Sequence, residues 1–359
     1  MQILSILAAL LLLGILVTVH EAGHFLAARL TGIEVMEFAI GFGPKLFSRK
    51  SRKTGTVFTL RVIPVGGFCA FYGEDDAEGK YQSDPRAMNR QPVWKRLITV
   101  AMGPVMNFVL ALVVTFLYFW IGGVPQQTGI DPFVSEVIAG GPADRAGLEA
   151  NDVILTINGV NVLDGTMEGI RNQVSTYHEG DEPLLLEVQR GQEKITATLT
   201  PRFDEKEGRY MLGVMLGGYY RIEVVPCGPG TAIASAWRIC VNAGGLIITS
   251  LRDLVTTGAG LEQTSGPVGI VTMVSQEVQQ NGFDAFVNFL VVISINLGIM
   301  NLLPIPGLDG SRLVFLVIEG IRRKPIDPRK EAVIHLCGML LLFALIILIT
   351  FKDIFNLFS

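Results

Sequence analysis

The sequence predicts a polytopic α-helical membrane protein with four transmembrane helices, a β-rich first cytoplasmic loop and one small α+β domain outside the membrane. Half of the 359 residues are hydrophobic and 17% are charged, whereas a soluble domain is about 25% charged. The chain therefore has too little polar surface to solvate one compact globule. Four separate apolar runs each approach the ~20 residues that a helix needs to cross a bilayer.

Composition also excludes several classes of protein. The high hydrophobic content excludes a disordered chain. A net charge of −4 leaves no basic excess to neutralise phosphates, which argues against nucleic acid as a partner. The four cysteines lie far apart without a CxxC motif, so neither a disulfide framework nor a thiolate zinc site is expected.

A fifth apolar run, at residues 231–251, is less regular than the other four. Arg238 and Asn242 interrupt it and Arg252 ends it, so an amphipathic helix at the membrane interface is favoured over a span. No Lys or Arg precedes the first run and no small-residue cleavage pattern follows it, so it is expected to remain a span rather than act as a signal peptide. The expected segments are a first transmembrane helix at 1–30, a first loop at 31–96, a second helix at 97–121, an outer domain at 124–218, a linker with the interfacial helix at 219–284, a third transmembrane segment at 285–312, a second cytoplasmic loop at 313–331 and a fourth helix at 332–351.

The charges of the loops predict the orientation. Residues 29–96 carry twelve Lys and Arg against seven Asp and Glu, whereas residues 122–284 carry ten basic and twenty acidic residues. Short basic loops stay in the cytoplasm. The first and third loops are therefore expected inside, and the second loop and both termini outside.

The second loop has the pattern of a separate domain. From Phe133 onward, short β-like runs alternate with turn residues; GPADRAGL opens a helix, and NDVILTINGV is typical of a strand that ends in an Asn-Gly hairpin turn. Residues 124–218 resemble a PDZ domain of the bacterial type. An unrelated small β domain is the alternative.

The first loop is unusual for a cytoplasmic linker. Its segments EFAIGFGPKLFSRK and TVFTLRVIPVGGFCAFYGE are β-branched, aromatic and glycine-rich, with little helical period. They are expected to pair as a hairpin pressed against the membrane or re-entering it. Such backbone is tolerated at membrane depth only where protein or a hydrated cavity shields it.

The first apolar run contains the motif His20-Glu21-Ala22-Gly23-His24. Positions i and i+4 share one helix face, so both imidazoles can bind a single metal ion. Glu21 is then placed to take a proton from the attacking water. Three ionisable residues inside an apolar segment cost several kcal/mol unless a function retains them, although a polar cluster that holds helices together is the alternative.

A catalytic zinc ion needs a third protein ligand and an open position for water. His178 lies in the outer domain and is expected to be a solvated loop residue, and His335 opens the fourth apolar run. Asp309 is better placed, because it ends the segment NLLPIPGLDG, whose prolines and glycines interrupt the third span. Exactly one span between the first and third brings Asp309 to the depth of the histidines, which also favours an interfacial segment at 231–251.

Two amides lie in the third span. Asn296 and Asn301 can serve as interhelical contacts, worth ~0.6 kcal/mol on average. Alternatively, they can hydrogen-bond an unwound substrate or the oxyanion that develops near the metal.

Together these motifs resemble the site-2 protease family of intramembrane zinc metalloproteases, in its bacterial, PDZ-containing branch of the regulator of sigma-E protease type. The resemblance covers essentially the whole chain and includes SGPVGI at 265–270. It implies that His20, His24 and Asp309 bind zinc and that Glu21 is the catalytic acid/base. A further set is implied to handle the substrate: Asn296, Asn301, Pro304 and Pro306, with Gly67 and Phe68 in the β-rich loop.

The resemblance also implies what the enzyme cleaves. Its expected substrates are transmembrane segments that another protease has already trimmed, such as anti-sigma factors or signal-peptide remnants, in a bacterial cell membrane. A single PDZ domain is visible, so gating by a second one is not expected. The competing hypothesis is a membrane-anchored PDZ scaffold or chaperone whose metal site is not catalytic.

Overall fold

The computed structural model describes residues 2–74, 84–163, 166–205, 207–260 and 266–358. The chain forms two compact units. One comprises residues 1–121 and 228–359 and contains the long helices, and the other comprises residues 122–227. Each unit is described by itself.

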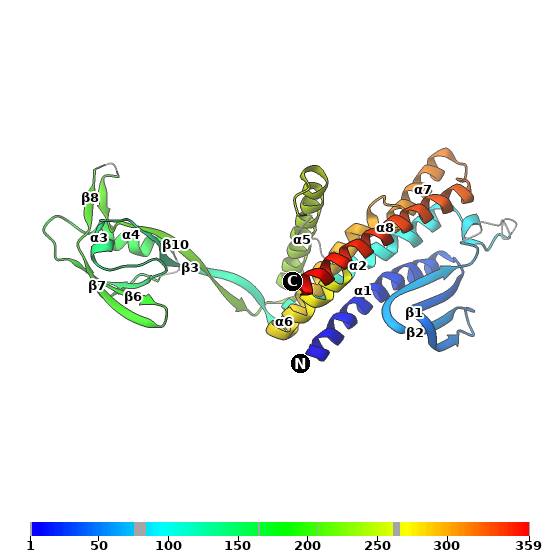
Figure 1. Cartoon of the computed structure of the whole chain (residues 1–359), viewed down its shortest axis with the longest axis horizontal. Helices are drawn as coiled ribbons and strands as arrows, with labels where there is room; N and C mark the ends of the chain where they lie inside the picture. The colour runs from blue at the N-terminus through cyan, green and yellow to red at the C-terminus, as the bar shows by residue number, and fades with distance from the viewer. Residues whose placement is uncertain (1, 75–83, 164–165, 206, 261–265, 359) are drawn as a thin grey trace. The chain divides into compact units, whose positions relative to one another are not determined.

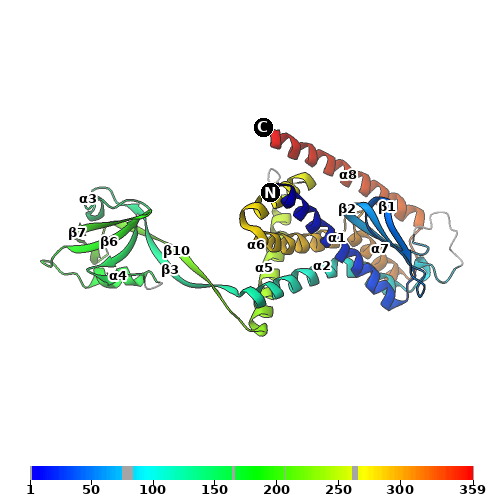
Figure 2. The same ribbon diagram turned by 90° about the horizontal axis from the view of Figure 1, so that it is seen from below.

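Two long helices, α1 (Gln2–Thr31) and α2 (Val93–Gly122), cross each other in the helical unit and come into close contact where Gly23 meets Met102 (Figure 1 and Figure 2). Their sequences are almost uniformly apolar, as expected for helices that cross a membrane. Ala9, Leu12 and Leu16 of α1 are buried against Leu290 and Val274 of a third helix. These contacts form one of the apolar cores of the unit.

The third helix, α6 (Pro267–Leu302), is longer than the predicted third span. Gly282 has non-helical backbone angles (φ 61°, ψ −134°), so the helix is kinked and its last part, after Gly282, corresponds to the apolar run. At the N-terminus of α6, the N–H groups of Gly266 and Gly269 donate hydrogen bonds to the Asp353 carboxylate, at 2.9 and 2.8 Å. Ser265 of the SGPVGI motif lies outside the described residues.

The remaining helices of this unit are α5 (Pro229–Thr257), α7 (Asp309–Arg322) and α8 (Pro328–Phe358). Among the described residues, five helices are long and apolar enough to cross a membrane: α1, α2, α5, α6 and α8. The sequence assigns α5 to the interface, yet its length and composition also allow a span. The protein is therefore a membrane protein with several apolar helices.

The first loop forms a small sheet from β1 (Val35–Lys50) and β2 (Val57–Phe71), which pair antiparallel. Both strands are bent, so that residues 37–40 of β1 pair with 57–60 on one side and with 67–70 on the other. Figure 2 shows this sheet beside α1. The expected strand pair is present, and it brings the glycine-rich end of β2 against the first helix.

The second unit is a β sheet with two short helices. Its sheet has the order β10-β3-β4-β6-β7, and β5 pairs with β4. Asn158 and Gly159 both have positive φ at the turn between β4 and β5, as a tight hairpin requires. The core includes Val134, Ile154 and Leu186, all fully buried. The elements are β3 (Val124–Val137), α3 (Pro142–Arg145), β4 (Val153–Ile157), β5 (Val160–Asn161), α4 (Glu168–Ser175), β6 (Leu184–Arg190), β7 (Glu193–Leu199), β8 (Arg202–Asp204), β9 (Arg209–Met211) and β10 (Val214–Val225).

Candidate metal centre

Three potential metal ligands from two helices converge inside the helical unit. The Nε2 atoms of His20 and His24 lie 3.0 and 3.3 Å from Oδ2 of Asp309, and 3.2 Å from each other. Both histidines are only 7% exposed. Among the described residues, these three form the group whose ligand atoms are close enough together to share a metal ion.

The local sequence explains how each ligand reaches this point. His20 and His24 are one turn apart on α1 and therefore share a face. The chain leaves α6 at Leu302, and α7 begins at Asp309. Pro304 and Pro306 between them lack backbone N–H groups and cannot continue the helix. The break therefore directs the first carboxylate of α7 toward α1.

The distances fit zinc. A tetrahedral zinc ion with bonds of about 2.0–2.2 Å separates its ligand atoms by roughly 3.3–3.5 Å. The three observed separations, from 3.0 to 3.3 Å, are close to this value. Two imidazoles and one carboxylate are also a donor set that zinc uses in catalytic sites, where a fourth position stays open.

Residues of α2 contact the second ring nitrogen, Nδ1, of both histidines. His24 Nδ1 lies 2.9 Å from the backbone oxygen of Thr99, and His20 Nδ1 lies 3.1 Å from Nδ2 of Asn107. Hydrogen bonds to the second ring nitrogen orient metal-binding histidines. Sequence reasoning missed both contacts; the amide of Asn107 inside an apolar run was a usable signal, whereas the Thr99 carbonyl has none.

Gly103 allows α2 to come close to the metal ligands. A Cβ atom added at this position would overlap the Nε2 and Cε1 atoms of His24. The absence of a side chain is therefore a requirement of the His24 position.

Glu21 faces the sheet of the first loop. Its carboxylate lies close to the backbone N–H of Cys69 in β2. A Cβ added at Gly67 would lie 3.5 Å from Cγ of Glu21 and 2.7 Å from the backbone oxygen of Ala39. The clash with Ala39 shows that the close pairing of β1 and β2 requires a glycine here, and the 3.5 Å distance shows that this part of β2 is in van der Waals contact with Glu21. The neighbouring Phe68 is half-buried, with the Arg61 guanidinium 5.0 Å from its ring centre.

The other residues singled out in the sequence have different surroundings. Asn296 is exposed on α6 and Asn301 is half-buried near its end; five residues apart, they point about 140° away from each other around the helix. Pro304 is exposed in the break. His335 Nδ1 accepts a hydrogen bond from the Gly307 N–H at 3.3 Å, and neither it nor the exposed His178 belongs to the ligand group.

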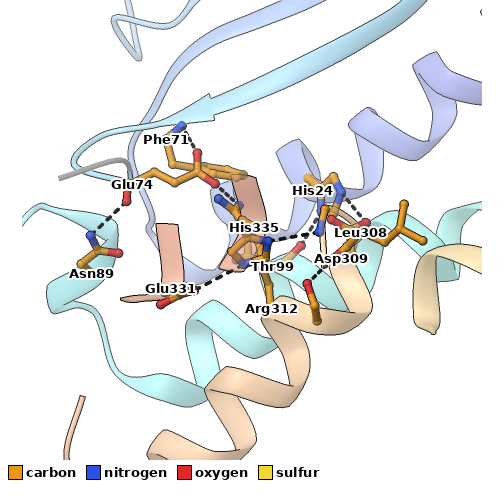
Figure 3. A network of polar contacts seen from close by, with 12 residues as sticks. His24, Phe71, Glu74, Asn89, Thr99, Leu308, Asp309, Arg312, Glu331 and His335 are labelled. Carbon is orange, nitrogen blue, oxygen red and sulfur yellow. Dashed lines mark hydrogen bonds and ion pairs between the residues drawn. The ribbon is translucent and has the colours of Figure 1, made fainter. Parts of the chain in front are cut away.

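A cavity of about 680 Å³ reaches Asp309 from the side of α7 and α8, and its lining combines apolar side chains with several charged ones. Arg96 makes two hydrogen bonds to Glu319, at 3.1 and 2.5 Å. Arg312, one turn after Asp309, pairs with Glu74 at the end of the first-loop sheet (Figure 3). This ion pair ties the sheet to the helix that carries the third ligand.

Comparison with known proteins agrees with this arrangement. The chain matches peptidase family M50 over residues 8–345. It is 33% identical to the regulator of sigma-W protease RasP of Bacillus subtilis, with 99% of each chain covered. It is similar to two proteins named zinc metalloprotease RasP: one from Bacillus licheniformis, 33% identical with 99% of each chain covered, and one from Geobacillus kaustophilus, 31% identical with 98% and 97% covered.

Proposed function

The chain belongs to peptidase family M50, the zinc metalloproteases of the site-2 protease type, and from this premise we propose how its residues cleave a peptide bond within a membrane. The observation that carries the proposal is the convergence of His20, His24 and Asp309 at the ligand spacing of zinc. They lie where the apolar helices α1 and α2 meet the first residue of α7. Ionisable groups beside apolar membrane helices are costly unless a function retains them.

We assign His20, His24 and Asp309 as the zinc ligands. When bound there, zinc supplies a Lewis acid for a peptide carbonyl and makes water a usable nucleophile near neutral pH. The fourth position of the site is left for the reactants. The ligand residues orient these reactants, and their burial keeps the site apart from bulk water.

Glu21 moves the proton. Its carboxylate is adjacent to the first ligand in the chain and takes a proton from the attacking water. It then donates this proton to the leaving amine, as general acid/base catalysis requires. The backbone of Cys69 lies beside this carboxylate at the edge of the sheet.

The substrate binds as an unwound segment beside Glu21. A helical transmembrane substrate hides its peptide bonds, so it must unwind before it can be cleaved. An extended segment can add to the edge of β2 near Gly67 and Phe68, where this strand lies in contact with Glu21. Asn301, Asn296 and Pro304 would hold the other side of the unwound segment, with the amides hydrogen-bonding its backbone.

We further propose that four helices cross the membrane, namely α1, α2, the last part of α6 and α8. Charged residues along α5 favour an interfacial position for this helix. In this topology the termini and the unit 122–227 lie outside a bacterial cell membrane, and the metal centre lies toward the cytoplasm. Residues 124–218 act as a PDZ domain that serves as a size filter in preference to binding a free C-terminus.

The substrates fit this filter. We propose that they are membrane proteins that another protease has first trimmed on the outside, either anti-sigma factors or signal-peptide remnants. A relative's name, regulator of sigma-W protease, supports the first class.

Purified protein in liposomes, incubated with a model transmembrane peptide, tests the proposal. We expect cleavage that a chelator abolishes and that added zinc restores. The two expected fragments should end within the apolar segment of the peptide. Cleavage that continues after complete removal of metal would contradict the assigned chemistry.

A further inference from the structure

Asn107 is the one side-chain amide in the described structure that contacts a proposed zinc ligand. It is completely buried, and its Nδ2 atom lies 3.1 Å from Nδ1 of His20. Its Oδ1 atom is also buried and has no hydrogen-bond partner within the described residues. Leaving a buried polar atom without a partner is unfavourable, so a residue that only filled space would not be expected to be an asparagine.

The backbone of Asn107 is held in place from the other side. The Ser294 hydroxyl of α6 donates a hydrogen bond to the Asn107 carbonyl oxygen at 2.8 Å. The amide can still turn by 180° about its Cβ–Cγ bond, which exchanges its oxygen and nitrogen without moving any neighbouring atom. The amide therefore has two orientations toward His20.

Resting on the proposed function, we infer that Asn107 is a positioning residue that selects the tautomer of His20 and thereby controls zinc binding. A neutral imidazole carries one N–H, and zinc binds the other nitrogen. For Nε2 of His20 to bind zinc, Nδ1 must carry the proton and needs an acceptor. The turned amide supplies one, because it places Oδ1 at the position 3.1 Å from Nδ1.

The opposite orientation suits the site before zinc binds. There the amide nitrogen donates to Nδ1, so the proton of His20 lies on Nε2. From there it can be donated to the Nε2 lone pair of His24, 3.2 Å away. A carboxamide serves both tautomers because it both donates and accepts.

His24 has no such choice. Its Nδ1 faces the Thr99 carbonyl oxygen, which can only accept a hydrogen bond. The proton of His24 is therefore held on Nδ1, and its Nε2 lone pair faces the ligand group permanently. Of the two histidines, only His20 changes tautomer when zinc binds.

The zinc dissociation constant of the full-length protein in detergent, measured by competition with a chromophoric chelator, tests this inference. Asn107→Leu removes both donor and acceptor and should weaken zinc binding about 10–100-fold, as loss of a histidine's outer partner does. Asn107→Asp keeps only the acceptor and should retain zinc at least as tightly as the unaltered protein. Ser294→Ala is the matched control, because it removes a hydrogen bond to Asn107 without touching the amide, and it should leave zinc binding within about threefold.

Nitrogen NMR of protein labelled with ¹⁵N-histidine provides a second readout without metal. The unaltered zinc-free protein should show the His20 proton on Nε2, and Asn107→Asp should show it on Nδ1. Unchanged zinc affinity in Asn107→Leu overturns the inference, as does a loss in Asn107→Asp equal to that in Asn107→Leu, or the same His20 tautomer in both zinc-free proteins. If His20→Ala also binds zinc normally, the proposed ligand set itself is wrong.

Discussion

Replacing Gly103 by alanine should disable the metal centre without unfolding α2. The added Cβ would overlap the ring of His24, so the ring must move by on the order of 1 Å to restore van der Waals contact. Zinc–ligand distances tolerate only about ±0.2 Å, and a misplacement of about 1 Å at a reacting centre costs up to ~10²-fold in rate. Helix propensity acts in the opposite direction, since alanine is favoured over glycine by about 1 kcal/mol.

The assay compares Gly103→Ala with Gly245→Ala, in which the added Cβ has no heavy atom within 4 Å. Both purified proteins are tested for zinc affinity, for peptide cleavage and for thermal unfolding. Gly103→Ala should bind zinc at least tenfold more weakly and cleave about 100-fold more slowly at an unchanged unfolding temperature, whereas Gly245→Ala should match the unaltered protein. Normal zinc binding and cleavage in Gly103→Ala would refute the close packing of α2 against His24.

Three further experiments test the third ligand, the Asp152–Arg190 pair and the orientation. Asp309→Ala should lower the zinc content of the purified protein whereas His335→Ala should not; the reverse result would transfer the third ligand to His335. Burial alone would raise the pKa of Asp152, but the Arg190 guanidinium holds this pKa below its usual value. The pair therefore stabilises the unit of residues 122–227 above pH ~4, and this stabilisation is lost as the pH falls through the lowered pKa. Arg190→Leu should therefore destabilise that unit at neutral pH and by less in acid, as followed by limited proteolysis; a loss that grows in acid would contradict this. A cysteine introduced at Gly180 should react with an impermeant thiol reagent from outside the cell, and labelling only after lysis would reverse the orientation.

The three residues that converge as a possible metal site could be singled out from the sequence, because each has a local signature. Spacing of four residues places His20 and His24 on one helix face, whatever the rest of the chain does. Asp309 follows two prolines that end a helix, so its position at a break in an apolar segment is visible in the sequence. Their mutual distance of about 3 Å required the tertiary structure.

The supporting contacts could not be predicted in the same way. The Thr99 carbonyl acts through the backbone, which any residue provides. The pairing of Glu74 with Arg312 joins residues 238 positions apart, and neither residue lies in a motif. Asn107 was visible as an amide in an apolar run, but its partner depends on the register of α1 against α2.

The start of the helix that contains the third apolar run could not be predicted from hydropathy either. The apolar run begins after Gly282, whereas the helix continues back to Pro267 through a kink. Residues before the kink are stabilised by the Asp353 carboxylate of α8, which accepts hydrogen bonds at the start of α6. That contact depends on two helices distant in the chain and has no local signal.

The most direct test of the central claim is the pairing of zinc content with cleavage in Glu21→Gln. Glutamine keeps nearly the same shape but cannot take a proton from water, so the variant should retain one zinc ion per chain and lose at least 10²-fold in cleavage rate. Undiminished cleavage of the model transmembrane peptide by the zinc-loaded variant would contradict the assignment of Glu21 as the proton carrier.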